Sequence, residues 1–71
     1  MPHPATTAVL RFFEYEHLSG DLREISRRCG ILAHEMADTL DGTAHGAELT
    51  TGLRKLLEAK DCFVRAALSV D

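Results

Sequence analysis

Aromatic residues are scarce in this sequence and unevenly placed. The 71 residues include no tryptophan, one tyrosine and three phenylalanines. Phe12, Phe13 and Tyr15 lie together in the segment RFFEYEH, residues 11 to 17. A core of this size is only marginally stable by itself, so small domains usually need a disulfide, a metal or self-association. The sequence therefore predicts one small domain that depends on contacts with other copies.

Cysteine is also rare, and no apolar run is long enough to cross a bilayer. Cys29 and Cys62 could form one disulfide at most. Met1 to Thr7 is polar and contains two prolines, unlike the hydrophobic part of an export signal. We therefore expect both cysteines to be reduced core residues of a cytoplasmic protein.

The chain lacks an excess of positive charge. Its formal net charge is −3, which argues against general affinity for nucleic acids. Residues 1 to 30 are balanced, whereas residues 31 to 49 carry four acids and no Lys or Arg. Residues 50 to 71 carry four basic and three acidic side chains. An anion-binding role must therefore rest on a local cluster of cations.

Helical patterns begin after a flexible segment expected over residues 1 to 6. Thr6 or Thr7 is expected to cap a short helix over residues 7 to 18, in which Phe12 and Phe13 pack. Ser19 is then the expected N-cap of a helix over residues 19 to 40.

The segment DGTAHG, residues 41 to 46, is typical of a turn because it contains Gly42 and Gly46. A last helix is expected over residues 47 to 70. The sequence therefore predicts a single all-α domain over residues 1 to 71, with a short N-terminal helix followed by a long antiparallel helical hairpin.

Both long helices carry a heptad seam, meaning apolar residues spaced alternately three and four apart. The first seam consists of Leu22, Ile25, Cys29, Leu32 and Met36, and the second of Leu49, Leu53, Leu56, Lys60, Phe63, Ala67 and Val70. The last helix has another apolar stripe on an adjacent face: Leu53, Leu57, Val64 and Leu68. One antiparallel neighbour cannot cover both stripes, so we expect a homo-oligomer.

Lys60 is the most informative single residue, because it occupies a seam position where an apolar residue is expected. It must snorkel, meet an acid from another helix or meet an anionic ligand, and it can also specify register. Antiparallel pairing places Arg28 level with Lys60, with Arg27 beside it. These cations invite an anion such as phosphate. The alternative is that Glu24 pairs with Arg27 or Arg28 on the surface.

Tyr15 beside basic side chains suits base stacking and phosphate binding, or it simply covers the end of the hairpin. The segment HEMAD, residues 34 to 38, has Asp38 where a zinc protease helix has its second histidine, and no third ligand is evident. No nucleophile with its base can be assembled either, so we expect no metal, no cofactor and no catalysis.

The segments FEYEHLSGDLREISRRCGILAHEMADTL and LRKLLEAKDCFVRAAL resemble the small phage proteins of the anti-CBASS and anti-Thoeris hairpin-domain family. The resemblance spans about residues 9 to 70. It implies a helical homo-oligomer, commonly a hexamer, that acts in the host bacterial cytoplasm. Such proteins are sponges: they bind cyclic dinucleotides or trinucleotides without cleaving them, so that CBASS-type immune signalling is blocked. The negative net charge and the lack of a long apolar run lead us to expect no DNA or RNA polymer and no membrane as a partner.

By position, the resemblance implies that Tyr15 and Arg27 bind a cyclic dinucleotide, with Arg28 as a neighbouring candidate. Lys60 is a further candidate because antiparallel pairing places it level with Arg28. A separate trinucleotide site would use Thr51, Arg54 and Lys55, although the threonine is equally explained by helix capping. The main alternative function is a helical adaptor or assembly module that binds a protein partner through its surplus apolar face. A nucleic-acid-binding regulator is disfavoured by the negative charge.

Overall fold

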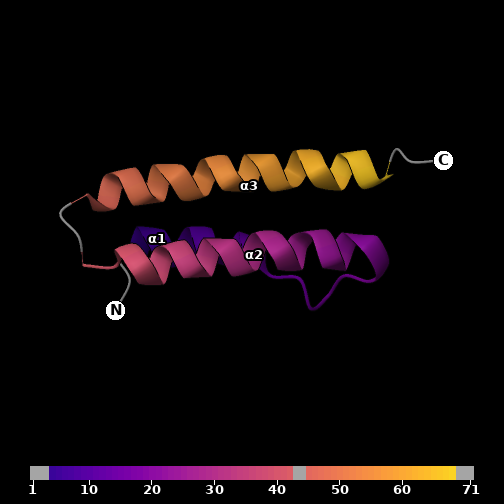
Figure 1. The fold of residues 1–71 in the computed structure, drawn as a ribbon, viewed down its shortest axis with the longest axis horizontal. Helices are drawn as coiled ribbons and strands as arrows, with labels where there is room; N and C mark the ends of the chain where they lie inside the picture. Colours follow the sequence, from indigo (N-terminus) through magenta and orange to yellow (C-terminus); the bar gives the residue numbers. More distant parts are fainter. Residues whose placement is uncertain (1–3, 43–44, 69–71) are drawn as a thin grey trace.

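The computed structural model describes residues 4–42 and 45–68, and all the regular structure within them is helical (Figure 1). The elements are α1 (Pro4–Leu10), a short 3-10 helix η1 (Arg11–Phe13), α2 (Gly20–Leu40) and α3 (Gly46–Leu68). Helices α2 and α3 run antiparallel side by side, and α1 packs behind them in the view of Figure 1. The molecule measures 45 × 19 × 16 Å. The predicted all-α class is confirmed.

The first helix begins earlier than the sequence pattern predicts. Pro4 starts α1, which fits the preference of proline for the first turn, where its missing N–H costs nothing. Residues 4–6 are therefore helical rather than flexible, and the rest of that predicted segment lies outside the described residues. Thr6 does not cap the helix: it is buried within α1, and its hydroxyl lies 3.4 Å from that of Thr50 in α3.

The same segment also ends earlier than predicted. Glu14 has extended backbone angles, φ −62° and ψ 143°, so the helix predicted to reach residue 18 stops at Phe13. Tyr15 consequently lies in the loop that joins η1 to α2. Phe13 is 1% exposed but Phe12 is 65% exposed, so the prediction that both pack is right only for Phe13.

The two long helices lie where the sequence predicts them, within one or two residues at each described end. Ser19 is at the N-cap position of α2, but its side chain makes no capping hydrogen bond. Gly20 follows with φ +62°, a conformation that favours glycine. Thr43 and Ala44 in the predicted turn, and Val70 in the predicted last helix, lie outside the described residues.

The buried face of α2 is offset from the predicted seam. Leu32 and Met36 are 44% and 39% exposed, whereas Ala33 and Ala37 are almost completely buried. The residues of α2 that the structure buries are small: Ser26, Cys29, Gly30, Ala33 and Ala37. Small side chains allow α1, η1 and α3 to approach closely, so this face is the one that the chain covers and the larger residues stay outside.

Gly30 is where η1 and α2 come closest. A Cβ atom on Gly30 would lie 3.0 Å from the carbonyl oxygen of Phe13, which is a backbone atom. A larger residue at this position therefore requires the 3-10 helix to shift.

We predict that Gly30→Ala destabilises the protein although alanine is the better helix former. Overpacking costs about 1–3 kcal/mol, while the gain in helix propensity is about 1 kcal/mol. Gly46→Ala at the start of α3 is the control, because nothing lies within 4 Å of the added Cβ. Urea unfolding at one protein concentration should show a loss for the first variant and a gain for the second. Equal gains would contradict the close contact of η1 with Gly30.

Candidate functional site

The loop after η1 returns across α2 and places Tyr15 against that helix. Tyr15 is half-buried, and its ring edge lies beside Gly30: a Cβ added there would be 3.8 Å from Tyr15 Cδ1. The carbonyl oxygen of Tyr15 accepts a hydrogen bond of 3.0 Å from the Leu18 N–H, which closes the loop into a turn. The tyrosine is thus held by backbone contacts on both sides of its position.

Arg23 lies over the ring of Tyr15. The guanidinium carbon is 5.9 Å from the ring centroid, within the range of a cation–π interaction. Arg23 was not among the predicted site residues. Arg23 lies four residues before Arg27, so both lie on one helix face. This spacing could have identified Arg23 as a site residue from the sequence.

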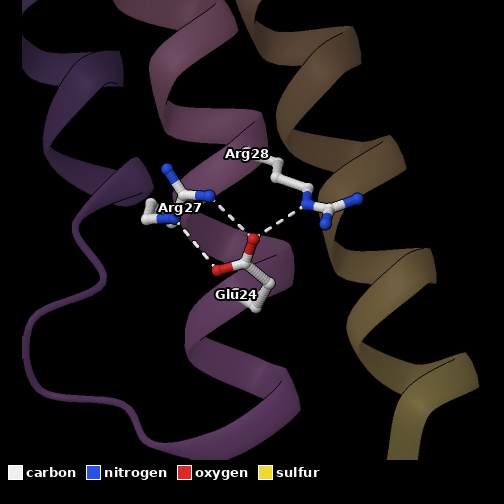
Figure 2. Close-up of polar contacts among 3 residues, drawn as sticks. All are labelled: Glu24, Arg27 and Arg28. Carbon is white, nitrogen blue, oxygen red and sulfur yellow. Dashed lines mark hydrogen bonds and ion pairs between the residues drawn. The ribbon is translucent and has the colours of Figure 1, made fainter.

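Glu24 binds Arg27 and Arg28 at the same time (Figure 2). Arg27 donates from Nε to Glu24 Oε2 at 3.0 Å and from Nη2 to Oε1 at 2.7 Å. Arg28 donates from Nε to Oε1 at 2.9 Å. The hydrogen bonds from Arg27 and then Arg28 lower the pKa of Glu24 from 4.5 to about 2. The predicted surface pairing is confirmed for both arginines.

The two arginines lie on different sides of α2. In Figure 2, Arg27 lies toward the N-terminal segment and Arg28 toward α3. Glu24 has the largest effect in raising the pKa of Arg27, and Tyr15 is close enough to add to it. Arg28 instead lines a groove of about 460 Å³ between α2 and α3, together with Ile25, Cys29, Phe63, Ala66 and Ala67. Tyr15, Arg23 and Arg27 therefore form one cluster, which we call the Tyr15 face, and Arg28 lies at its edge.

Lys60 is held inside the molecule rather than presented to solvent. Its side chain is 13% exposed, and its Nζ donates a 2.7 Å hydrogen bond to the carbonyl oxygen of Phe12. The ammonium also lies 5.8 Å from the ring centroid of Phe13. The sequence led us to expect that Lys60 reaches solvent, an acid of another helix or an anionic ligand. The structure instead pairs its ammonium with a backbone carbonyl oxygen. A role of Lys60 in ligand binding stays a prediction.

Lys60 also affects Cys29 on the facing helix. Burial raises the pKa of the Cys29 thiol, and the charge of Lys60 partly opposes this rise. Cys29 is buried and Cys62 is exposed, and both are free thiols. The expectation that both cysteines are core residues is therefore wrong for Cys62.

The residues predicted for a second site are on the outside of α3. Thr51, Arg54 and Lys55 are all exposed. The neighbouring Thr50 donates to the carbonyl oxygen of Gly46 at 3.1 Å and contacts Thr6, so its hydroxyl serves the packing of the helices. The structure brings the three predicted residues to one exposed stretch of α3, and their role stays a prediction.

Residues 4–42 and 45–68 contain no group of three His, Cys, Asp or Glu side chains suited to hold a metal ion. Within the same ranges, no helix has the length and apolar character needed to cross a membrane. Comparison with protein-family models, with curated proteins and with solved structures gives no match. The geometry of the Tyr15 face and the resemblance described above therefore carry the function proposed below.

We predict that Lys60→Met loosens the segment that carries Tyr15. The substitution keeps an apolar stem but removes the donor to Phe12, which should cost about 1 kcal/mol in the free energy of unfolding. Tyr15 is the only tyrosine and there is no tryptophan, so the intrinsic fluorescence reports mainly on this one residue. Its emission should change in Lys60→Met. Lys55→Met, an exposed position on the same helix, should leave both measurements unchanged.

If Lys60→Met unfolds like the unmodified protein and its Tyr15 emission is unaltered, the bond to Phe12 does not hold the loop.

Proposed function

We propose that this chain binds and sequesters cyclic oligonucleotide second messengers, in the first place cyclic dinucleotides such as cGAMP, without cleaving them. The observation that carries the proposal is the Tyr15 face. A half-buried tyrosine lies under the Arg23 guanidinium, 5.9 Å from its ring centroid, and Arg27 follows about one turn further on the same face of α2. The ring suits stacking on a nucleobase, and the arginines suit charge-assisted hydrogen bonds to phosphate.

The biological setting follows from the family that the sequence resembles. In that setting the protein acts in the cytoplasm of a bacterium infected by a phage. It removes the messenger made by an immune cyclase, so that the CBASS effector is not triggered. Sequestration works by mass action, and the affinity must exceed that of the effector for the same ligand. No bond is broken, and no cofactor is required.

Self-association is the second part of the proposal. The face of α2 and α3 that α1 does not cover carries two apolar grooves. One groove, of about 520 Å³, lies near the connection between the two helices. It is lined by Leu32, Met36, Leu40, His45, Glu48, Leu49, Gly52, Leu53 and Leu56. Together with the groove beside Arg28, it forms what we call the open face.

A second copy in antiparallel orientation suits the open face. Such a copy would set the groove near one copy's α2–α3 connection against the groove beside the other copy's Arg28. Glu48, which lines the first groove, would then lie near Arg28, which lines the second groove of the other copy. Apolar surface would meet apolar surface, and each acid would meet a cation. We propose that helical hairpins paired in this way build a homo-oligomer, a hexamer by the resemblance.

A second ligand site for cyclic trinucleotides is proposed at Thr51, Arg54 and Lys55 on the resemblance alone. The exposure of these side chains on α3 is compatible with a site completed by another subunit.

The open face also favours one alternative function, a helical adaptor. Leu32, Met36, Leu40 and Phe63 are between 39% and 54% exposed, and another protein could cover them instead of a second copy. In this alternative Tyr15 contributes only packing at the end of α2.

We predict that calorimetry with a panel of cyclic di- and trinucleotides detects binding and that heating the complex releases unmodified ligand. Binding should quench the fluorescence of Tyr15, because a stacked base contacts its ring. Tyr15→Ala and Arg27→Ala should each weaken dinucleotide binding about tenfold or more, as expected when a stacking or charged contact is lost. Arg54→Ala is the control and should leave dinucleotide binding unchanged.

If no member of the panel binds at micromolar protein concentration, the sequestering function is wrong and the adaptor function is favoured. Normal binding by both Tyr15→Ala and Arg27→Ala would retain the function but move the site elsewhere.

We also predict that Met36→Glu shifts the oligomer toward monomer in analytical ultracentrifugation, because a carboxylate would be buried in an apolar contact. His34→Glu introduces the same charge at an exposed position of α2 outside the groove and should leave the assembly intact. A monomeric unmodified protein, or equal behaviour of the two variants, would contradict self-association through the open face.

A further inference from the structure

Glu24 occupies one of the two edges of the Arg27 guanidinium that can bind a phosphate. Each edge carries two parallel N–H donors, which form strong contacts with an oxyanion. In Arg27 the edge of Nε and Nη2 donates to Glu24, at 3.0 and 2.7 Å. An anion at the Tyr15 face therefore meets an arginine with one edge already used and a carboxylate charge beside it.

The carboxylate is a persistent competitor. The hydrogen bonds from Arg27 and Arg28 keep the pKa of Glu24 at about 2, so it stays ionised at neutral pH. It is attached to the same helix, three residues before Arg27, and an anion from solution must displace a neighbour that never diffuses away. If Arg27 turned to a ligand, Glu24 would keep the bond of 2.9 Å from Arg28. Releasing Arg27 therefore does not leave the carboxylate without a partner.

We propose that Glu24 sets an affinity threshold at the Tyr15 face: by competing for Arg27 it weakens the binding of small phosphate-containing anions, so that a ligand binds well only if it also stacks a base on Tyr15. This inference deepens the proposed function and rests on it for the identity of the ligand. Displacing an exposed ion pair costs up to about fivefold in affinity. Stacking one base contributes from about fivefold to more than a hundredfold. A cyclic dinucleotide can therefore displace Glu24, whereas inorganic phosphate or pyrophosphate cannot do so effectively.

The test compares Glu24→Gln with Glu35→Gln in the full chain. Glutamine keeps the shape and one acceptor oxygen but removes the charge. Glu35 is exposed and lies about three turns further along α2 on the same side, on the order of 16 Å away, so its substitution changes the net charge equally. Inorganic pyrophosphate is the probe, and the Nε–H NMR signals of the arginine side chains report which of them it contacts.

We expect pyrophosphate to bind Glu24→Gln about fivefold or more tightly than it binds either the unmodified protein or Glu35→Gln, with the Arg27 signal shifting. This factor corresponds to removing one charge at contact distance in a largely aqueous setting. Cyclic dinucleotide binding should strengthen by a similar factor, because its phosphate displaces the same carboxylate, while the base stacked on Tyr15 keeps it the tighter ligand in every variant.

Equal tightening in the two variants would show an effect of net charge only and would overturn the inference. Weaker pyrophosphate binding by Glu24→Gln would also overturn it, because Glu24 would then be positioning the arginines for the ligand. If Glu24→Gln alone gains pyrophosphate affinity but no cyclic oligonucleotide binds any form, the competition at Arg27 stands and the proposed function is wrong.

Discussion

The close contact between η1 and Gly30 of α2 is the constraint on which the rest of the structure depends. The Phe13 carbonyl occupies the space where any other residue at position 30 would place its Cβ, at 3.0 Å. Lys60 fixes the same segment from α3 by donating to the carbonyl oxygen of Phe12 at 2.7 Å. With both contacts in place, Phe13 is buried and the following loop returns over α2. The position of Tyr15 is therefore a consequence of how Phe12 and Phe13 are anchored.

This constraint also decides which side of α2 is buried. Close approach requires small residues, so Ala33 and Ala37 face inward and Leu32 and Met36 stay partly exposed. The resulting core is thin: its buried members are Val9, Phe13, Cys29, Ala33, Ala37 and Leu53. Two alanines bury little apolar area, and a domain of this length is only marginally stable by itself. Association through the open face would bury the larger side chains that the internal packing leaves out.

The sequence predicted the long helices well because their periodicity and the glycines between them are local signals. It did not predict which of two adjacent faces of α2 is covered, since Leu32 and Ala33 belong to overlapping apolar patterns. Only the position of η1, a contact distant in sequence, distinguishes them. Likewise, Lys60 pairs with a backbone carbonyl, which no side-chain pattern reveals. The spacing of Arg23 and Arg27 shows that they share a helix face. The sequence does not show that Tyr15 packs on the same face, because this depends on the extended backbone at Glu14.

The charge distribution gives the proposed site a way to distinguish a small ligand from a polymer. Electrostatic interactions in solution decay over about 8 Å at physiological salt. A compact dianion at the Tyr15 face would meet three nearby cations and two nearby carboxylates, namely Arg23, Arg27, Arg28, Glu16 and Glu24. A nucleic acid strand extending along the molecule would also meet residues 31 to 49, with four acids and no Lys or Arg. A local cationic cluster on an acidic chain therefore favours ligands no larger than that cluster, which suits the proposed sequestration of a cyclic dinucleotide.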